Sequence, residues 1–200
     1  MPKFAANLTM MYNEVDFLDR FEAAAKSGFK GVEYLFPYPF GTEELAERLA
    51  QHGLTQVLHN LPAGDWGAGE RGVACLPDRV GEFQDGVGQA IEYAQALDCR
   101  QINCLAGLTP EGTDPDRVRE TFVANLKFAA DKLGAAGIRL LIEPINTRDI
   151  PGFYLTGTQQ ALDVIAATGS DNIALQYDIY HMQIMEGNLA PTIEANLAQI

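Results

Sequence analysis

Two acidic residues that follow apolar runs are the strongest candidates for chemistry in this sequence. Glu143 follows the run RLLI (residues 139–142), and Asp178 follows the run IALQY (residues 173–177). A carboxylate at the end of a buried strand is costly unless it meets a partner. If the two runs form neighbouring strands, about 4.8 Å apart, the carboxylates can share one cation. The pair therefore predicts a metal site, and a salt bridge to an arginine is the structural alternative for Glu143.

The ligand types indicate which metal such a site would hold. Carboxylate oxygens favour hard divalent ions such as Mg²⁺ or Mn²⁺. No Cys–His cluster has the spacing of a zinc site, and Cys104, which ends another apolar run, is more simply a small core residue. We predict that Glu143 and Asp178 bind Mg²⁺ or Mn²⁺.

Other polar residues lie at the ends of apolar runs as well. His59 and Asn60 end residues 55–60, and His181 follows Asp178 by three positions. We predict that His59, Asn60 and His181 bind substrate. A hydrogen-bonded structural role is the alternative for each histidine. The remaining strand ends carry polar residues too: Asn7, Glu33 and Asn103.

The elements that would bring these residues together follow from the hydrophobic pattern. Short runs rich in β-branched and aromatic residues alternate with amphipathic stretches, which is typical of βα units around a parallel sheet. The predicted strands are residues 4–7, 31–35, 55–60, 101–104, 139–143 and 173–178. Apolar residues at steps of three and four predict helices between them, for example Phe83, Val87, Ile91, Ala94 and Leu97.

Capping residues delimit the predicted helices. Asp114, followed by Pro115, is a predicted N-cap, as are Thr42 and Thr158. Glycines between a helix and the following strand predict left-handed C-caps: Gly28, Gly53, Gly137 and Gly169.

The spacing of the strand ends favours a (β/α)8 TIM barrel, in the α/β class. The ends from Asn7 to Asp178 recur about every 34 residues, close to the roughly 31 per unit of an eight-unit barrel. About six units are present in residues 1–200, so we expect a single barrel domain whose units seven and eight lie beyond Ile200. A doubly wound open sheet is the alternative, but its glycine-rich phosphate-binding turn is absent after the first strand.

Composition narrows the function classes. The 200 residues are 47% hydrophobic and 20% charged, with a formal net charge of −13. Such a charge repels nucleic acid and anionic membranes, so neither is an expected partner. The N-terminus lacks the pattern of a signal peptide and the three cysteines are odd in number, which favours a cytoplasmic protein with free thiols. A homo-oligomer is compatible with this sequence.

Five sequence blocks resemble the hydroxypyruvate isomerase family of the xylose-isomerase-like TIM barrel superfamily. The similarity extends along the whole chain, and the most specific blocks are HNLPAGDW (59–66), GERGVAC (69–75), INCLAG (102–107), LLIEPINTRDIPGF (140–153) and QYDIYHMQ (176–183). The resemblance implies metal ligands from strand five (Glu143) and strand six (Asp178). It also implies a ligand from strand seven and a second glutamate from strand eight. Because neither is in this sequence, we expect a chain that ends at Ile200 to be inactive.

The same resemblance implies a reaction. Hydroxypyruvate and 2-hydroxy-3-oxopropanoate (tartronate semialdehyde) would interconvert through a metal-held enediolate, with Glu143 in acid/base catalysis; a hydride shift is the alternative route. His181 resembles the family histidine that hydrogen-bonds the substrate hydroxyl. Because the substrate is an anion and the protein is acidic, a local cation is needed, and Arg71 and Arg148 are candidate carboxylate ligands.

Four other functions are compatible with parts of this pattern. An isomerase of a longer 2-oxo acid sugar, such as 2-oxo-tetronate, is nearest, followed by a sugar epimerase of the same superfamily. The apurinic-site endonucleases that share the barrel need zinc, many histidines and a basic groove, whereas this chain has three histidines and a charge of −13. A metal-free barrel that acts only as a binding module is the alternative outside enzymes.

Overall fold

A computed structural model describes residues 3–200 and contains one six-stranded parallel sheet whose strands alternate with helices. The strands are β1 (Ala5–Asn7), β2 (Gly31–Glu33), β3 (Thr55–Asn60), β4 (Gln101–Cys104), β5 (Arg139–Ile142) and β6 (Ile173–Leu175). The α-helices are α1 (Arg20–Lys26), α2 (Thr42–His52), α3 (Val80–Ala96), α4 (Pro115–Ala135), α5 (Thr158–Thr168), α6 (Ile179–Met185) and α7 (Leu189–Asn196). Two short 3-10 helices, Phe17–Asp19 and Pro77–Arg79, precede α1 and α3.

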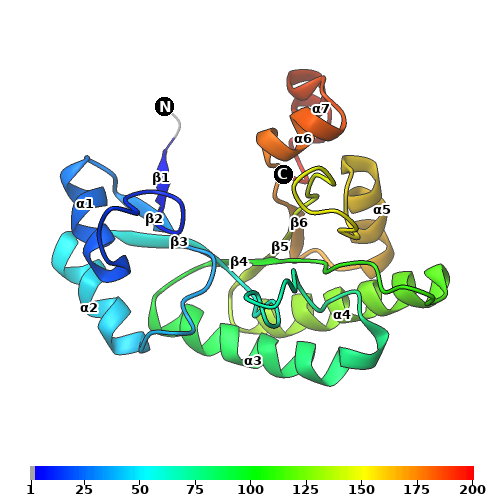
Figure 1. Cartoon of the computed structure of the whole chain (residues 1–200), viewed down its shortest axis with the longest axis horizontal. Helices are drawn as coiled ribbons and strands as arrows, with labels where there is room; N and C mark the ends of the chain where they lie inside the picture. The colour runs from blue at the N-terminus through cyan, green and yellow to red at the C-terminus, as the bar shows by residue number, and fades with distance from the viewer. Residues whose placement is uncertain (1–2) are drawn as a thin grey trace.

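The order of the strands decides between the two predicted architectures. The strands follow one another across the sheet in chain order, from β1 to β6, and every neighbouring pair is parallel. The sheet curves into an open arch, and α1 to α5 cover its outer side (Figure 1). A doubly wound sheet would reverse its order and carry helices on both faces. The structure therefore confirms the TIM-barrel fold, of which about six units are present.

Both lateral edges of the arch belong to the first and last strands. Within residues 3–200, β1 pairs only with β2 and β6 pairs only with β5 among the strands. The backbone N–H of Leu175 in β6 donates to the carbonyl of Gln199, 2.7 Å away, so the C-terminal segment lies against this edge. No helix in the described part of the chain is long and apolar enough to cross a lipid bilayer.

The predicted strand ends are accurate to within a few residues. β3 and β4 match the prediction residue for residue, whereas β5 ends at Ile142 and β6 at Leu175. Glu143 and Asp178 therefore lie just beyond their strands. Two local features explain the difference: Pro144 has no N–H to continue a ladder, and the side chain of Asp178 caps α6 instead.

The caps are confirmed in part. Asp114 is the N-cap of α4, and its side chain accepts from the N–H of Asp116 at 3.1 Å. The N-caps predicted at Thr42 and Thr158 are wrong by one residue, because these threonines are the first residues of α2 and α5 and glycines precede them as caps. All four glycines predicted as left-handed have positive φ, between 62° and 92°.

Burial follows the predicted helical stripes. Phe83, Val87 and Ala94 of α3 are buried against α4 and the central strands, and Leu97 is buried just past the end of α3. Apolar residues of α1, α2, β1 and β2 form a second, smaller cluster. These two clusters thus hold the helices against the outer side of the sheet.

The loop that connects β3 to α3 is anchored on the loop after β4. The N–H of Cys75 donates to the carbonyl of Ala106 at 2.8 Å, and Gly72, at φ 117°, packs directly against the backbone of Leu105 and Gly107. A Cβ at Gly72 would lie 2.9 Å from the nitrogen of Gly107. Only glycine combines this φ with so close an approach.

We expect Gly72→Ala to lower the free energy of unfolding by about 1–3 kcal/mol, because it adds both backbone strain and a steric clash. Urea unfolding followed by circular dichroism measures the change. Gly88→Ala is the matched control: Gly88 lies inside α3 with no atom within 4 Å of the added Cβ. That substitution should stabilise by about 0.5–1 kcal/mol. Equal effects of the two variants would contradict the assigned close packing.

Candidate active site

Residues from all six strand ends surround one cavity of about 420 Å³. Its walls combine apolar side chains, Trp66 among them, with carboxylate, amide and imidazole groups. The polar residues in its lining are Asn7, Glu33, Asn60, Glu143, Gln176, Asp178 and His181. The C-terminal ends of the strands are where parallel barrels carry their active sites. This cavity is therefore the candidate site.

Glu143 is the most perturbed acid in the cavity. It follows β5 directly, is 7% exposed, and its Oε2 accepts from Nδ2 of Asn103 at 2.9 Å. Burial raises the pKa of Glu143 to about 8, and the nearby charge of Asp178 adds to the rise, while Gln176 and Asn103 oppose it. A carboxyl group with such a pKa can both hold and release a proton near neutral pH.

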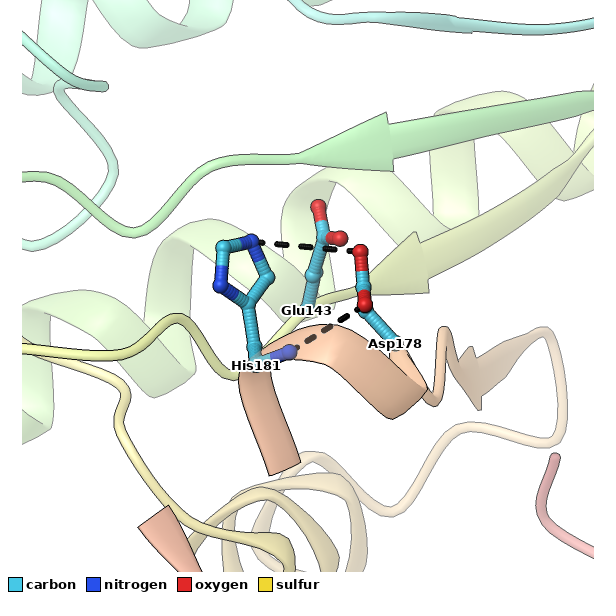
Figure 2. A group of neighbouring side chains, drawn as sticks. All are labelled: Glu143, Asp178 and His181. Atoms are coloured by element: carbon cyan, nitrogen blue, oxygen red, sulfur yellow. Dashed lines mark hydrogen bonds and ion pairs between the residues drawn. The ribbon is translucent and has the colours of Figure 1, made fainter. Parts of the chain in front are cut away.

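The two carboxylate oxygens of Asp178 have different roles: one caps a helix, and the other faces the cavity. Its Oδ1 accepts from the backbone N–H of Tyr180 (2.7 Å) and of His181 (3.2 Å), which caps the N-terminus of α6. Its Oδ2 lies 3.9 Å from Nε2 of His181. Figure 2 shows the Asp178 carboxylate, the His181 ring and the Glu143 carboxylate gathered at one point.

The two carboxylates of this cluster fit a divalent cation. Glu143, Asp178 and His181 each offer a ligand atom, and the three atoms lie within 4.8 Å of one another. Burial is the main cause of the raised pKa of Glu143, and repulsion from the Asp178 carboxylate adds to it; a cation between the two carboxylates would relieve the repulsion. The predicted pairing of Glu143 with Asp178 in one site is in agreement with this geometry.

Glu33 is a third acid in the cavity, and we did not select it from the sequence as a site residue. It ends β2 and accepts from Nδ2 of Asn7 at 3.0 Å. Burial raises the pKa of Glu33, Asn7 opposes the shift, and the charge of Asp178 adds to it. Its position at a strand end was the available signal, but its proximity to Asp178 depends on the curvature of the sheet.

A chain of buried amides extends the site from Glu143. Asn103 donates from Nδ2 to both Glu143 and Oδ1 of Asn60, the latter at 3.2 Å. Asn60 is 3% exposed and lines the cavity. Its Nδ2 has no hydrogen-bond partner within residues 3–200. Asn60 therefore carries a buried donor that a bound molecule can satisfy.

Residues 21–199 match the family model described as xylose isomerase-like TIM barrel. The chain belongs to this family. It is 56% identical over 96% of its length to hydroxypyruvate isomerase of Escherichia coli and covers 75% of that protein. It is 48% identical over its whole length to 2-oxo-tetronate isomerase of Cupriavidus necator and covers 77% of it. The predicted enzyme class, an isomerase, is confirmed by these relatives.

A crystal structure described as AP endonuclease, family 2 from Brucella melitensis superposes with a TM-score of 0.95. That chain is 50% identical, and the match covers 98% of this chain and 75% of the Brucella protein. The six parallel strands of this chain are therefore arranged as they are in the Brucella structure.

His59 does not reach the cavity. Side chains alternate along a strand, so Asn60 faces the cavity and His59 faces the outer side. His59 is 1% exposed, its Nδ1 lies 3.0 Å from Nε2 of Gln56, and its ring meets the edge of Tyr38. Burial lowers the pKa of His59 to about 4. The position corrects our expectation of substrate binding and corresponds to the structural alternative.

The two arginines also lie outside the cavity lining. Arg71 donates to the carbonyls of Trp66 (3.1 Å) and Glu70 (2.7 Å), and its guanidinium stacks 4.1 Å above the Trp66 ring. Arg148 is exposed in the turn after β5. Arg71 thus supports a cavity wall through Trp66, and neither side chain is positioned as the predicted direct ligand of a carboxylate.

The raised pKa of Glu143 predicts a pH-dependent stability. Between about pH 4.5 and about pH 8 the folded protein holds a proton on Glu143 that the unfolded chain has lost. The contribution of this residue to the free energy of unfolding therefore falls as the pH rises through this window. Glu143→Gln has no proton to lose, so its stability should fall less between about pH 6 and about pH 9.

Urea unfolding in metal-free buffer at the two pH values measures this difference. Glu120→Gln, at an exposed position of α4, is the matched control and should behave like the unsubstituted protein. Parallel pH dependence in Glu143→Gln and the unsubstituted protein would show that Glu143 is not the buried acid responsible.

Proposed function

We propose that this protein isomerises a small 2-oxo acid bearing a hydroxyl group next to its ketone, with Glu143 as the acid/base. Hydroxypyruvate is the proposed substrate and 2-hydroxy-3-oxopropanoate the product. The observation that carries the proposal is a buried carboxyl group beside a second carboxylate in a cavity at the strand ends. The names of the two curated relatives support the reaction class.

The proposed isomerisation requires one group that first accepts a proton as a base and then returns it as an acid within one turnover. Glu143 removes a proton from the carbon that bears the hydroxyl group, and an enediolate results. A proton then returns to the former carbonyl carbon while another moves between the two oxygens, so substrate and product contain the same atoms. The position of the Glu143 carboxyl group in the cavity suits both transfers, whereas its pKa of about 8 belongs to the metal-free protein and would be lowered by a bound cation.

We propose that Glu143 and Asp178 hold a divalent ion, and their oxygen ligands favour Mg²⁺ or Mn²⁺. When bound, such an ion polarises the carbonyl and makes the adjacent C–H more acidic. Asp178 is suited to this task because its Oδ1 is fixed by the N-terminus of α6 while its Oδ2 faces the cavity.

The substrate carboxylate is proposed to bind amide donors. The lining of the cavity contains no arginine or lysine among the residues that the structure describes. The free Nδ2 of Asn60 can donate to an oxygen of the substrate, and His181 lines the same cavity. The proposed role of Arg71 is indirect, through the position of Trp66.

The length of the substrate is a finer part of the proposal. A cavity of about 420 Å³ accommodates either a three-carbon or a four-carbon acid. The higher identity to hydroxypyruvate isomerase, 56% against 48%, favours the three-carbon substrate. Comparing kcat/KM for hydroxypyruvate and 2-oxo-tetronate tests this choice directly.

Cleavage of abasic DNA is the second candidate, because the Brucella structure carries the name AP endonuclease. Three features oppose it: a net charge of −13, three acids in the cavity, and a single histidine in the cluster that could hold metal. Such a surface repels a phosphate backbone. Incision of an abasic duplex by the purified protein would favour this candidate over the isomerase.

The central test is turnover of hydroxypyruvate by the whole protein that contains these residues, supplied with Mg²⁺ or Mn²⁺. We expect Glu143→Gln to reduce kcat by about 10²–10⁴-fold, the usual loss when a general acid/base is removed. Circular dichroism controls for folding. Retention of more than about a tenth of the activity would remove Glu143 from its proposed role.

The substitution Asp178→Asn tests the proposed role of Asp178 in metal binding without removing its role as the N-cap of α6. Asparagine is as good an N-cap as aspartate, so α6 should keep its first turn. The lost charge should weaken Mg²⁺ or Mn²⁺ binding, measured by calorimetry, and activity should return in part at high metal concentration. Unchanged metal affinity together with lost activity would mean that Asp178 is not a ligand.

A further inference from the structure

Asn146 is a buried residue of the loop after β5, and the mechanism above gives it no role. Its side chain is fully buried and makes three hydrogen bonds. Its Oδ1 accepts from the backbone N–H of Asp149 at 2.8 Å, and its Nδ2 lies 2.9 Å from Oδ2 of Asp149 and 2.7 Å from Nδ1 of His181. The residue thus connects the loop to the imidazole of the cavity.

The orientation of the Asn146 amide follows from its two contacts with Asp149. A backbone N–H can only donate, so the atom that faces it must be the amide oxygen. An ionised carboxylate can only accept, so the atom that faces Oδ2 must be the amide nitrogen. Hydrogen bonding by Tyr180, whose hydroxyl lies 2.7 Å from Oδ2, and by Asn146 lowers the pKa of Asp149 and keeps it ionised.

The orientation of the Asn146 amide determines which ring nitrogen of His181 carries the proton. The Nδ2 of Asn146 has only hydrogens to offer, so Nδ1 of His181 must be the acceptor. In a neutral imidazole the proton is then on Nε2, the atom 3.9 Å from Oδ2 of Asp178. His181 therefore directs an N–H group toward the proposed metal and substrate site.

We infer that Asn146 is a positioning residue that fixes His181 as the Nε2–H tautomer. The histidine already proposed to bind substrate is thereby held as a hydrogen-bond donor toward the site and offers no bare nitrogen to a metal. A ligating histidine needs a bare nitrogen toward the metal and an acceptor for its other N–H. Here the other nitrogen faces an amide N–H. His181 can thus donate a hydrogen bond to Asp178 or to an oxygen of the substrate. Donation to the substrate rests on the proposed function.

Nitrogen NMR of the whole protein labelled with ¹⁵N-histidine tests the inference without reference to turnover. In alkaline buffer, where imidazole is neutral, a bare ring nitrogen resonates far downfield of a protonated one. His181→Gln identifies the signals of His181. We expect the downfield signal at Nδ1 and the protonated signal at Nε2, both before and after saturation with Mg²⁺.

Asn146→Asp tests whether the amide sets the tautomer. A carboxylate at this position accepts, so the proton of His181 should move to Nδ1 and the downfield signal to Nε2. Gln159→Glu, an amide-to-acid change at an exposed position of α5, is the matched control and should leave the His181 signals unchanged. If Asn146→Asp does not fold, the unsubstituted protein still provides the test.

Three results would overturn the inference: a protonated Nδ1 in the unsubstituted protein, loss of the Nε2 proton on addition of Mg²⁺, or an unchanged tautomer in folded Asn146→Asp. These results are independent of the proposed reaction. A protein that turns over no hydroxypyruvate but shows the Nε2–H tautomer would refute the function and support the inference.

Discussion

The arrangement of this site depends on one electrostatic constraint, the burial of Glu143 close to a second acid. Burial and the charge of Asp178 both raise the pKa of Glu143, and the side chains of Asn103 and Gln176 offset only part of that rise. A fold that places two carboxylates together at the ends of neighbouring strands must supply a proton or a cation to them. Both the proton and the cation can serve catalysis, because a proton on Glu143 can be transferred to a substrate and a bound cation can polarise a carbonyl group.

Several site residues use one polar atom for structure and leave another for the cavity. Asp178 caps α6 with Oδ1 and turns Oδ2 inward, and His181 accepts from Asn146 at Nδ1 while its Nε2 faces Asp178. Groups held in this way have little freedom to rearrange when a ligand arrives. Such preorganisation is what a site for small molecules needs, since few contacts are available to fix the orientation of the proposed three-carbon acid.

The charge of the protein shapes how an anion can bind. Long-range attraction is absent at a net charge of −13, and the cavity lining adds Glu33, Glu143 and Asp178 to that negative field. Binding of the proposed anionic substrate would therefore depend on short-range donors and on the proposed metal ion. Arg71, stacked on Trp66, stabilises the wall and does not neutralise the substrate. Arg71 therefore contributes to the shape of the cavity, whereas the charge inside the cavity is set by its acidic residues.

The sequence by itself determined the strand order, the helical faces and the pairing of Glu143 with Asp178, because these depend on local patterns of apolar residues and on the regular spacing of βα units. Only the tertiary structure decided which side of each strand faces the cavity, and a shift of one residue exchanges the two sides. His59 and Asn60 are adjacent in sequence, yet one packs outside the sheet and the other lines the site. The contact of Asn146 with a histidine 35 residues away likewise depends on how two loops fold over the sheet, which no local pattern encodes.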